Sequence, residues 1–450
     1  MGRLRVLLLG PDCDPETVSI PLVTYHHAAA LARLHRVTLV ARSSVEDALR
    51  RAKAPFDAIE VVRTPLLDRI FDWCFRRILK SNYATQKVTV LRYPFALAFE
   101  WRAWRQLRHR IFASEFDLVL RLVPMASVLP SPFAFFLRKG PIPFVIGPIT
   151  GGLPWPPGFS QQNEREWISG LRNLYRLLPF ARSTYRHAAA IIAASSQTYS
   201  EFSPYRDKLF FVPEPGIDAS LCVGDFRPSE PRAKLELIFV GGLIPRKACD
   251  LALRGAAPLL RNDLARFTVV GDGPERNNLE QLTRSLGIEK AVLFCGWLSH
   301  WEVLRRLQAA DVMVFPSIRD NGAGVVFEAL ASGTVPVVAD FGGPGDIVHP
   351  QVGYKVPLTN ESDIVSQIEK VLADLAGNWD LLNRLQQQGV SYARERLTWD
   401  AKAQATTQVL DWAVRRGPKP NLPPPKQLHL GCAKSSSAVT KPFDGEFTRL

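Results

Sequence analysis

The sequence is poor in cysteine and lacks the cysteine spacings that bind metals or build disulfide frameworks. Its 450 residues include six scattered cysteines: Cys13, Cys74, Cys222, Cys249, Cys295 and Cys432. Because none forms a CxxC pair, we interpret them as buried or incidental thiols in a reducing compartment. This absence argues against a disulfide-stabilised secreted domain and against a metal site built on cysteine.

A long uninterrupted apolar run is also missing. The longest apolar tract, residues 122–137, contains three prolines, which argues against a membrane-spanning helix. The apolar stretch in MGRLRVLLLGPDCD is too short for a signal peptide and predicts a first core strand. With 46% apolar and 22% charged residues, the composition is that of a globular protein of about two or three domains. We therefore expect a cytoplasmic protein.

Positive charge is concentrated in one region of the chain. Residues 63–112 contain 11 basic and 3 acidic residues, interleaved with aromatic ones as in YPFALAFEWRAWRQLRHRIF. Such a segment is compatible with solvated helix faces over an aromatic core, or with a surface that lies on anionic lipid. No recognisable nucleic-acid-binding motif accompanies the charge, so we expect no nucleic-acid partner.

Short β-branched runs alternate with helical patterns, which predicts parallel sheets covered by helices. The first series of strand-like runs occupies residues 4–10, 36–41, 116–123, 144–147, 188–195 and 208–218. The second occupies residues 235–245, 266–275, 291–297, 311–317 and 334–340. The polar, proline-bearing segment 219–234 is interpreted as a hinge. We predict domains at 1–218 and 219–397, a helix at 398–416 and a disordered proline- and serine-rich tail at 417–450.

Glycine-bearing loops follow four strands of the second series. FVGGLIPRK supplies Arg246 and Lys247, VVGDGPE supplies Gly271, and FGGPGD covers residues 341–346. In parallel α/β sheets, ligands bind at the carboxyl ends of the strands, where glycine lets the backbone approach and cations neutralise phosphates. Each turn alone is explained by tight turn geometry. Four in one domain predict an anion-binding site.

The fourth loop is DNGAGVVFEALASG, which should become a helix near Gly324. The free N–H groups at a helix N-terminus offer a site for an anion. Glu328 would lie about one turn inside this helix, where its carboxylate could accept hydrogen bonds from sugar hydroxyls. Asp320, eight positions earlier, could do the same or could cap the helix.

These motifs resemble glycosyltransferase family 4. The resemblance rests on VGGLIPRK, VVGDGPE and the Asp-x7-Glu spacing in DNGAGVVFEALASGTVPVVA, and it covers most of residues 1–415. GPITGGLPWPPG at 147–158 resembles the family's glycine loop facing the interdomain cleft, and VPEPGID at 212–218 resembles its interdomain crossing. The resemblance implies an α/β GT-B fold: two Rossmann-like parallel-sheet domains facing a cleft, the first for the acceptor and the second for the donor, with a C-terminal helix crossing back.

The resemblance also implies roles for single residues. Lys247 would hold the donor diphosphate, Glu328 the donor ribose and Asp320 the transferred sugar. Arg246 would assist Lys247. The backbone N–H groups that cradle the diphosphate would belong to Gly322, Ala323, Gly324 and Val325. The nucleobase would meet Gly271, Trp297 and Leu298, while Gly10 and the loop after it would approach the phosphates from the first domain.

The implied activity is retaining transfer of a sugar from a nucleotide sugar to a hydroxyl of a glycan or lipid-linked acceptor, in polysaccharide or glycoconjugate biosynthesis. No cofactor or metal is expected, and residues 63–112 would rest on the inner face of the membrane. Two departures from the family pattern stand out: Gly242 replaces the usual arginine, and RLVPMASVLP lacks the usual histidine. They leave open a sugar-nucleotide epimerase of the same fold, or a non-catalytic binding subunit with a degraded donor site.

Overall fold

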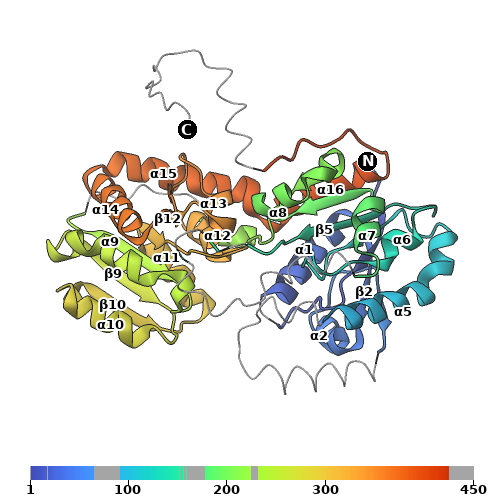
Figure 1. The fold of residues 1–450 in the computed structure, drawn as a ribbon, viewed down its shortest axis with the longest axis horizontal. Helices are drawn as coiled ribbons and strands as arrows, with labels where there is room; N and C mark the ends of the chain where they lie inside the picture. Colours follow the sequence, from blue (N-terminus) through green and yellow to red (C-terminus); the bar gives the residue numbers. More distant parts are fainter. Residues whose placement is uncertain are drawn as a thin grey trace, which may run out of the picture.

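The computed structural model describes residues 2–17, 19–64, 92–153, 155–156, 159, 178–223 and 232–424. Within these residues the chain forms two parallel sheets, each in its own lobe (Figure 1). The lobe with α1, α5 and β2 comes from the first half of the chain, and the lobe with α9, α10 and β9 comes from the second half. This arrangement confirms the predicted GT-B fold.

The described strands of the first sheet follow the order β3-β2-β1-β4-β5-β6-β7, with every neighbouring pair parallel. Their bounds are β1 Arg5–Leu9, β2 Arg36–Arg42, β3 Ala58–Val62, β4 Leu118–Arg121, β5 Phe144–Ile149, β6 Ala190–Ala193 and β7 Leu209–Phe211. All of them except β3 were predicted. The short run AIEVV carries a charged residue, so its hydrophobic signal is weak.

Helices cover both faces of this sheet. They are α1 Ile20–Leu34, α2 Glu46–Arg51, α5 Tyr93–Phe112, α6 Pro132–Phe136, α7 Ala181–His187 and α8 Ser196–Glu201. On α5, the buried residues Phe99, Ala103 and Leu107 recur at helical spacing and join a core with α6 and α7. The opposite face packs against α1, where Ala28 and Leu31 are fully buried.

The described strands of the second sheet follow the order β10-β9-β8-β11-β12-β13, again with parallel neighbours. Their bounds are β8 Leu235–Val240, β9 Ala265–Val270, β10 Val292–Gly296, β11 Val312–Phe315, β12 Val335–Ala339 and β13 Tyr354–Val356. The five predicted strands are present. The three-residue β13 was not predicted because YKV is too short to show a period.

The helices of this lobe share one apolar core with its strands. They are α9 Cys249–Arg261, α10 Arg276–Ser285, α11 His300–Ala309, α12 Gly324–Ala331, α13 Gly342–Ile347, α14 Glu361–Gly377 and α15 Trp379–Tyr392. Helix α12 begins at Gly324, where the sequence predicted its start. This order places the loops after β8, β11 and β12 at one edge of the sheet, because parallel strands end on the same side.

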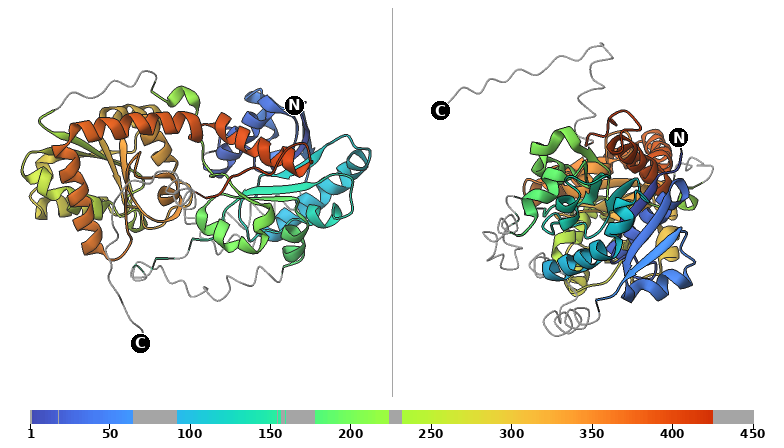
Figure 2. Two further views of the ribbon diagram at one scale, coloured as in Figure 1. Left: turned by 90° about the horizontal axis from the view of Figure 1, so that it is seen from above. Right: turned by 90° about the vertical axis from the view of Figure 1, so that its right-hand side faces the viewer.

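The C-terminal helix α16, Trp399–Ala413, returns to the first lobe. Figure 2 shows the helices at the end of the chain running from one lobe to the other. The Thr398 side chain caps α16 by accepting from Ala401 N–H, and Ala403, Val409 and Leu410 enter the core beside α1. The interdomain crossing at residues 212–218 is bound to the start of α16 by two hydrogen bonds. Trp399 N–H donates to Ile217 O at 2.9 Å, and Ile217 N–H donates to Leu397 O at 3.0 Å.

Two predicted segments lie partly outside the described residues. Of the basic segment 63–112, residues 65–91 are not described. Of the predicted tail, residues 425–450 are not described, while Leu422 accepts a hydrogen bond from Phe211 N–H at 2.8 Å beside β7. None of the helices in the described ranges combines the length and apolarity needed to cross a bilayer.

Candidate active site

The loops after β8, β11 and β12 are tied together by backbone hydrogen bonds. Ile318 N–H donates to Arg246 O at 2.9 Å, which joins the loop after β11 to the loop after β8. Gly343 N–H donates to Asp320 O at 2.9 Å, which joins the loop after β12 to the loop after β11. The loop after β9 is joined to the loop after β8 in the same way, since Leu243 N–H donates to Asp272 O at 2.9 Å. All four glycine-bearing loops predicted from the sequence therefore form one constellation.

Lys247 and Asp320 meet in this constellation. The Lys247 ammonium donates to the Asp320 carboxylate, and both side chains are largely buried. The same ammonium lies 4.8 Å from the centroid of the Phe315 ring at the end of β11. Charge-assisted contacts of this kind hold a cation in place more firmly than a neutral hydrogen bond. The predicted diphosphate-binding lysine and sugar-binding acid are thus adjacent.

The loop after β12 supports Asp320 through a glycine. Gly342 has a φ of +62°, and a Cβ at this position would lie 2.3 Å from Asp320 O. A side chain would therefore strain the turn and push the backbone of Asp320 away. The structure therefore requires glycine at position 342, whereas the sequence alone indicated only a tight turn.

The segment between Asp320 and α12 leaves open space at its backbone. Ala323 adopts a left-handed conformation with φ of +48° and caps α12 without a side-chain hydrogen bond. A Cβ on Gly324 would have no neighbour within 4 Å, and one on Gly322 would lie 3.7 Å from Pro215. The first N–H groups of a helix lack intrahelical acceptors, so this end of α12 can receive an anionic group. Val325 lies in the same first turn.

Glu328, in the second turn of α12, has a partner that the sequence analysis missed. Its Oε1 lies 3.1 Å from His300 Nε2 at the start of α11. The hydrogen bond to Glu328 raises the pKa of His300, against a smaller lowering by burial. His300 stands three residues after Trp297, but nothing in the local pattern singles it out. The pair orients the carboxylate predicted to bind the donor ribose.

The residues predicted to meet the nucleobase lie around the ends of β9 and β10. Gly271 N–H donates to Gly296 O at 2.9 Å, and a Cβ on Gly271 would lie 2.0 Å from Gly241 O. Gly271 is therefore required by close backbone approach. Trp297 is 79% exposed, whereas Leu298 packs against the core of the second lobe. An exposed indole at this edge offers a flat face for stacking.

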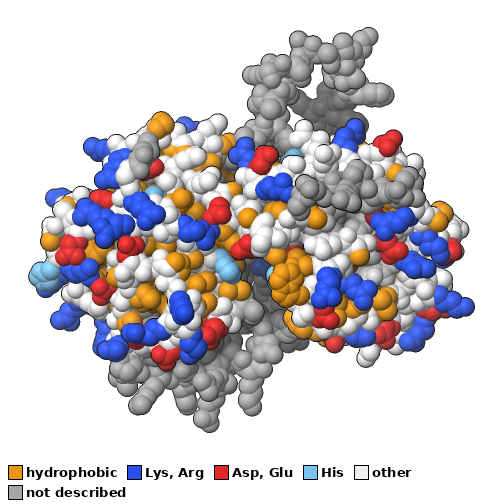
Figure 3. Space-filling view, turned by 180° about the vertical axis from the view of Figure 1, so that it is seen from behind, with side chains coloured by type: hydrophobic (Ala, Val, Ile, Leu, Met, Phe, Trp, Pro, Cys, Tyr) orange, Lys and Arg blue, Asp and Glu red, His pale blue; other side chains and the backbone are white. Residues whose placement is uncertain are grey.

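The first lobe reaches the second through the loop after β5. Arg319 Cζ lies 5.2 Å from the Trp155 ring centroid, and Phe159 enters the core of the second lobe. Ser196 N–H, at the start of α8, donates to Asp346 Oδ2 at 2.7 Å. A groove separates the two lobes on the face in Figure 3. The atoms nearest a Cβ at Gly10 belong to Leu39, Cys13 and Leu8 of the first lobe, and the approach of its loop to the phosphates stays a prediction.

The crossing segment brings a further acid close to Asp320. Glu214 O accepts a hydrogen bond from the ammonium of Lys402, whose side chain is buried on α16. Burial raises the pKa of the Glu214 carboxyl; Lys402 opposes this shift and the charge of Asp320 adds to it. Burial lowers the pKa of Lys402 to about 7, with the Glu214 charge opposing. Neither residue was singled out from the sequence.

The arrangement can be compared with known proteins. Residues 225–392 match the family model of glycosyl transferases group 1. The second lobe is similar to these enzymes. The match includes Lys247, Asp320 and Glu328, although it assigns no role to single residues.

Curated relatives are consistent with this group 1 similarity. The chain is 33% identical over 272 residues to a glycogen synthase of Mycobacterium tuberculosis, covering 57% of this chain and 62% of that protein. It is 32% identical over 232 residues to a D-inositol 3-phosphate glycosyltransferase of Streptomyces bingchenggensis, covering 46% and 49%. The chain thus spans less than two thirds of the length of either relative.

A solved structure extends the likeness to both lobes. HepE of Anabaena, crystallised in complex with UDP, matches over 91% of this chain and 100% of its own, with a TM-score of 0.59 and 16% identity. At this identity the likeness concerns the fold.

The surroundings of Gly242, in the region that matches the group 1 model, are open. The nearest atom to its Cβ position is Asp272 O at 4.0 Å, so there is room for a side chain that the chain does not supply. Arg276, the first residue of α10, pairs with Asp272 in the loop after β9 at 3.8 Å and with Glu280 on its own helix at 3.0 Å. Arg246 and Lys247 remain the cations on the turn after β8.

Proposed function

We propose that the protein is a retaining glycosyltransferase that moves a sugar from a nucleotide-sugar donor to a hydroxyl of a glycan or lipid-linked acceptor. The expected process is polysaccharide or glycoconjugate biosynthesis. One observation carries the proposal: Lys247 and Asp320 meet beside the open N-terminus of α12, within a lobe similar to glycosyl transferases group 1. A cation, free N–H groups and a carboxylate are what a sugar diphosphate requires.

Donor binding would rearrange the Lys247–Asp320 pair. The diphosphate would attract the Lys247 ammonium, with Arg246 assisting, and Asp320 would then accept hydrogen bonds from the sugar. Glu328 would accept from the ribose hydroxyls while His300 holds its carboxylate in place. The indole of Trp297 would stack on the nucleobase, since it is exposed beside Gly271 and Gly296.

The reaction would proceed on one face of the sugar. The bond between the anomeric carbon and the diphosphate oxygen breaks, and a bond from that carbon to the acceptor oxygen forms on the same side. A phosphate oxygen of the leaving group takes the acceptor proton, so no protein base is needed. Lys247 and the α12 N–H groups would stabilise the charge that develops on the diphosphate. We expect neither a metal ion nor a cofactor.

The first experiment is a thermal-shift screen of the full chain with UDP, GDP, ADP and their common sugars. UDP is a reasonable start because HepE was crystallised with UDP and with UDP-glucose. A nucleotide at a hundred times its dissociation constant should stabilise the protein by about 2.7 kcal/mol. Lys247→Ala and Glu328→Ala should each abolish the shift and sugar transfer.

Matched controls are available on the same lobe. Lys290→Ala and Glu289→Ala remove the same charges from exposed positions that precede β10. They should leave the nucleotide shift unchanged. Full activity in both Lys247→Ala and Glu328→Ala would show that the donor site has been misassigned, whereas no shift with any nucleotide would favour the non-catalytic binding subunit.

The epimerase alternative is separated by its products. An epimerase converts the donor sugar without any acceptor, so incubation with the nucleotide sugar alone would yield an isomeric nucleotide sugar. A glycosyltransferase would leave the donor intact or hydrolyse it slowly. Product analysis by NMR distinguishes the two outcomes.

We further propose that α5 contributes to a surface that rests on anionic lipid. Its exposed side includes Trp101 and Phe112, which are 46% and 55% exposed, together with Arg105 and Arg108. Exposed aromatic and basic residues on one helix suit a lipid interface. Neutralising Arg105 and Arg108 should weaken flotation with anionic vesicles. Equal and negligible binding of wild type and variant would remove the membrane part of the proposal.

A further inference from the structure

The interdomain crossing at residues 212–218 carries an acid, Glu214, between two prolines. The prolines fix their own φ angles, which limits the conformations open to this segment. The ammonium of Lys402, a buried residue of α16, donates to Glu214 O. A Cβ on Gly216 would lie 2.7 Å from the Trp399 indole, so the crossing packs closely on the start of α16. The backbone of Glu214 is therefore held in place from behind.

The side chain of Glu214 lies against the loop that carries Asp320. A Cβ on Gly322 would lie 3.8 Å from the carboxyl carbon of Glu214. Burial raises the pKa of the Glu214 carboxyl, and the charge of Asp320 adds to this shift, as expected for two neighbouring carboxyls. Asp320 and Gly322 both belong to the loop proposed to receive the donor. Glu214 thus brings a carboxyl from the crossing to the candidate donor site.

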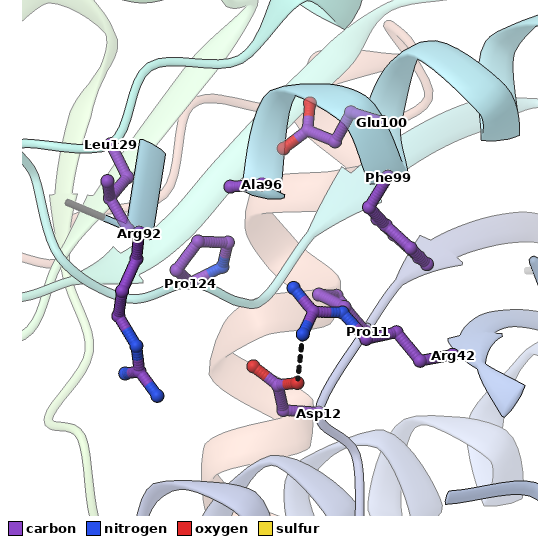
Figure 4. Close-up of a pocket in the computed structure, with 9 residues that line it drawn as sticks. All are labelled: Pro11, Asp12, Arg42, Arg92, Ala96, Phe99, Glu100, Pro124 and Leu129. Atoms are coloured by element: carbon purple, nitrogen blue, oxygen red, sulfur yellow. Dashed lines mark ion pairs between the residues drawn. The ribbon is translucent and has the colours of Figure 1, made fainter. Parts of the chain in front are cut away.

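Glu214 differs from the acids of a pocket in the first lobe. That pocket lies at the carboxyl edge of the first sheet, where Arg42 Nη1 lies 3.5 Å from Asp12 Oδ1 (Figure 4). Its other acid, Glu100, lies 2.7 Å from Arg121 Nε. In the described part of the chain, by contrast, no donor makes a hydrogen bond to the Glu214 carboxyl oxygens, and Glu214 is partly exposed. This carboxyl can therefore accept hydrogen bonds from a ligand.

The charges around Glu214 favour a hydroxyl over a phosphate as its ligand. Asp320 and Glu214 together would repel a phosphate, which has Lys247 and the N–H groups of α12 close by. A sugar hydroxyl can donate to a carboxylate without bringing a negative charge beside it. Because Asp320 belongs to the loop after β11 and Glu214 to the crossing, the two carboxyls can accept from different hydroxyls of one sugar.

We propose that Glu214 binds a hydroxyl of the transferred sugar and helps to determine which sugar the protein accepts. This inference rests on the proposed function, because it extends the donor site around Asp320. An epimer whose hydroxyl points elsewhere leaves the Glu214 carboxyl desolvated without a hydrogen bond, and this costs affinity. The contact therefore discriminates among sugars that share one nucleotide.

Isothermal titration with a nucleoside diphosphate and its nucleotide sugar separates the sugar contact from the nucleotide contacts. The pair is the one that the thermal-shift screen selects, beginning with UDP and UDP-glucose. Glu214→Ala should weaken the nucleotide sugar about tenfold or more and leave the diphosphate within about twofold of wild type, because only the sugar loses a hydrogen bond. Glu214→Gln should keep part of the affinity, since its amide oxygen still accepts. A merely structural role would distort the Gly322 loop and weaken both ligands.

Two other acids serve as controls. Glu328→Ala removes the acid proposed to bind the ribose, so it should weaken the diphosphate and the nucleotide sugar together. Glu289→Ala removes an exposed acid that precedes β10 and should weaken neither. Of these three variants, Glu214→Ala alone should change the ratio of the two affinities.

Deoxy analogues of the nucleotide sugar identify the hydroxyl. The analogue that lacks the hydroxyl bound by Glu214 should bind wild type and Glu214→Ala with equal affinity, because the interaction is already absent. The inference alone is overturned if Glu214→Ala leaves the ratio of the two affinities unchanged, or if it weakens every analogue as much as the parent compound. If wild type binds no nucleotide, the proposed function is refuted and this inference with it.

Discussion

Replacement of Lys402 by methionine should change how the stability of the protein depends on pH. Lys402 is 3% exposed, and its ammonium donates to Glu214 O in the interdomain crossing. Burial lowers its pKa from 10.5 to about 7, and Glu214 opposes this shift. A difference of that size corresponds to roughly 5 kcal/mol between the two protonation states.

The sign of the pH dependence follows from the number of protons that the folded and unfolded chains bind. The pKa is lower in the folded chain than in the unfolded chain, so between about pH 7 and 10.5 the unfolded chain binds more protons. The free energy of unfolding therefore rises with pH, by about 1.4 kcal/mol per pH unit across that window. Below pH 7 Lys402 is protonated in both the folded and the unfolded chain, so its contribution to the free energy of unfolding stays at its minimum. Nearby His27 does not titrate in the window, because burial lowers its pKa.

Urea denaturation at several pH values between about 7.5 and 9.5 measures the slope. Lys402→Met should lose about 1.4 kcal/mol per pH unit relative to wild type, while Lys370→Met, an exposed position on α14, should keep the wild-type slope. Only the slope is predicted, since methionine removes both a buried cation and its hydrogen bond. Equal slopes in wild type and Lys402→Met would refute the reasoning, because the lysine would then remain charged in the folded protein.

Three further variants test the site and its supports. Gly342→Ala should weaken nucleotide binding about tenfold or more, because its Cβ would displace the loop that carries Asp320. Gly377→Ala, where a Cβ has no neighbour within 4 Å, is the control. In Glu328→Gln, the pKa of His300 followed by NMR should fall, and an unchanged titration would mean that the pair does not form in solution. Glu100→Gln removes the carboxylate that pairs with the buried guanidinium of Arg121, so it should lower the free energy of unfolding by about 3–5 kcal/mol. A urea-measured loss below about 1 kcal/mol would contradict the buried pair.

Much of the fold was predictable because its signals are local. Apolar runs such as RVTLVA and DVMVFPS predict strands from a few consecutive residues, and the start of α12 followed from the small residues before it. The strands that were missed, β3 and β13, are short and only partly buried. Their position in the sheet comes from pairing with β2 and β12, which no local pattern contains.

The candidate site was predictable to a lesser extent. Lys247, Asp320 and Glu328 were identified because each lies in a motif that resembles a known family. The sequence showed no reason for His300 to meet Glu328, or for Lys402 to meet Glu214 across 188 positions. Gly10 packs against residues of the first lobe, and the expected approach of its loop to the phosphates stays a prediction.

The amino-acid sequence by itself determined most of the strands, the start of α12 and the glycine turns, since hydrophobic period and turn chemistry act over a few residues. Only the tertiary structure decided which charges face one another. The sheet order β2-β1-β4 brings Arg42 beside Asp12, and the return of α16 carries Lys402 beneath the crossing segment. Such pairs depend on the packing of whole elements, because residues far apart in the chain become neighbours only after the sheets and helices have assembled.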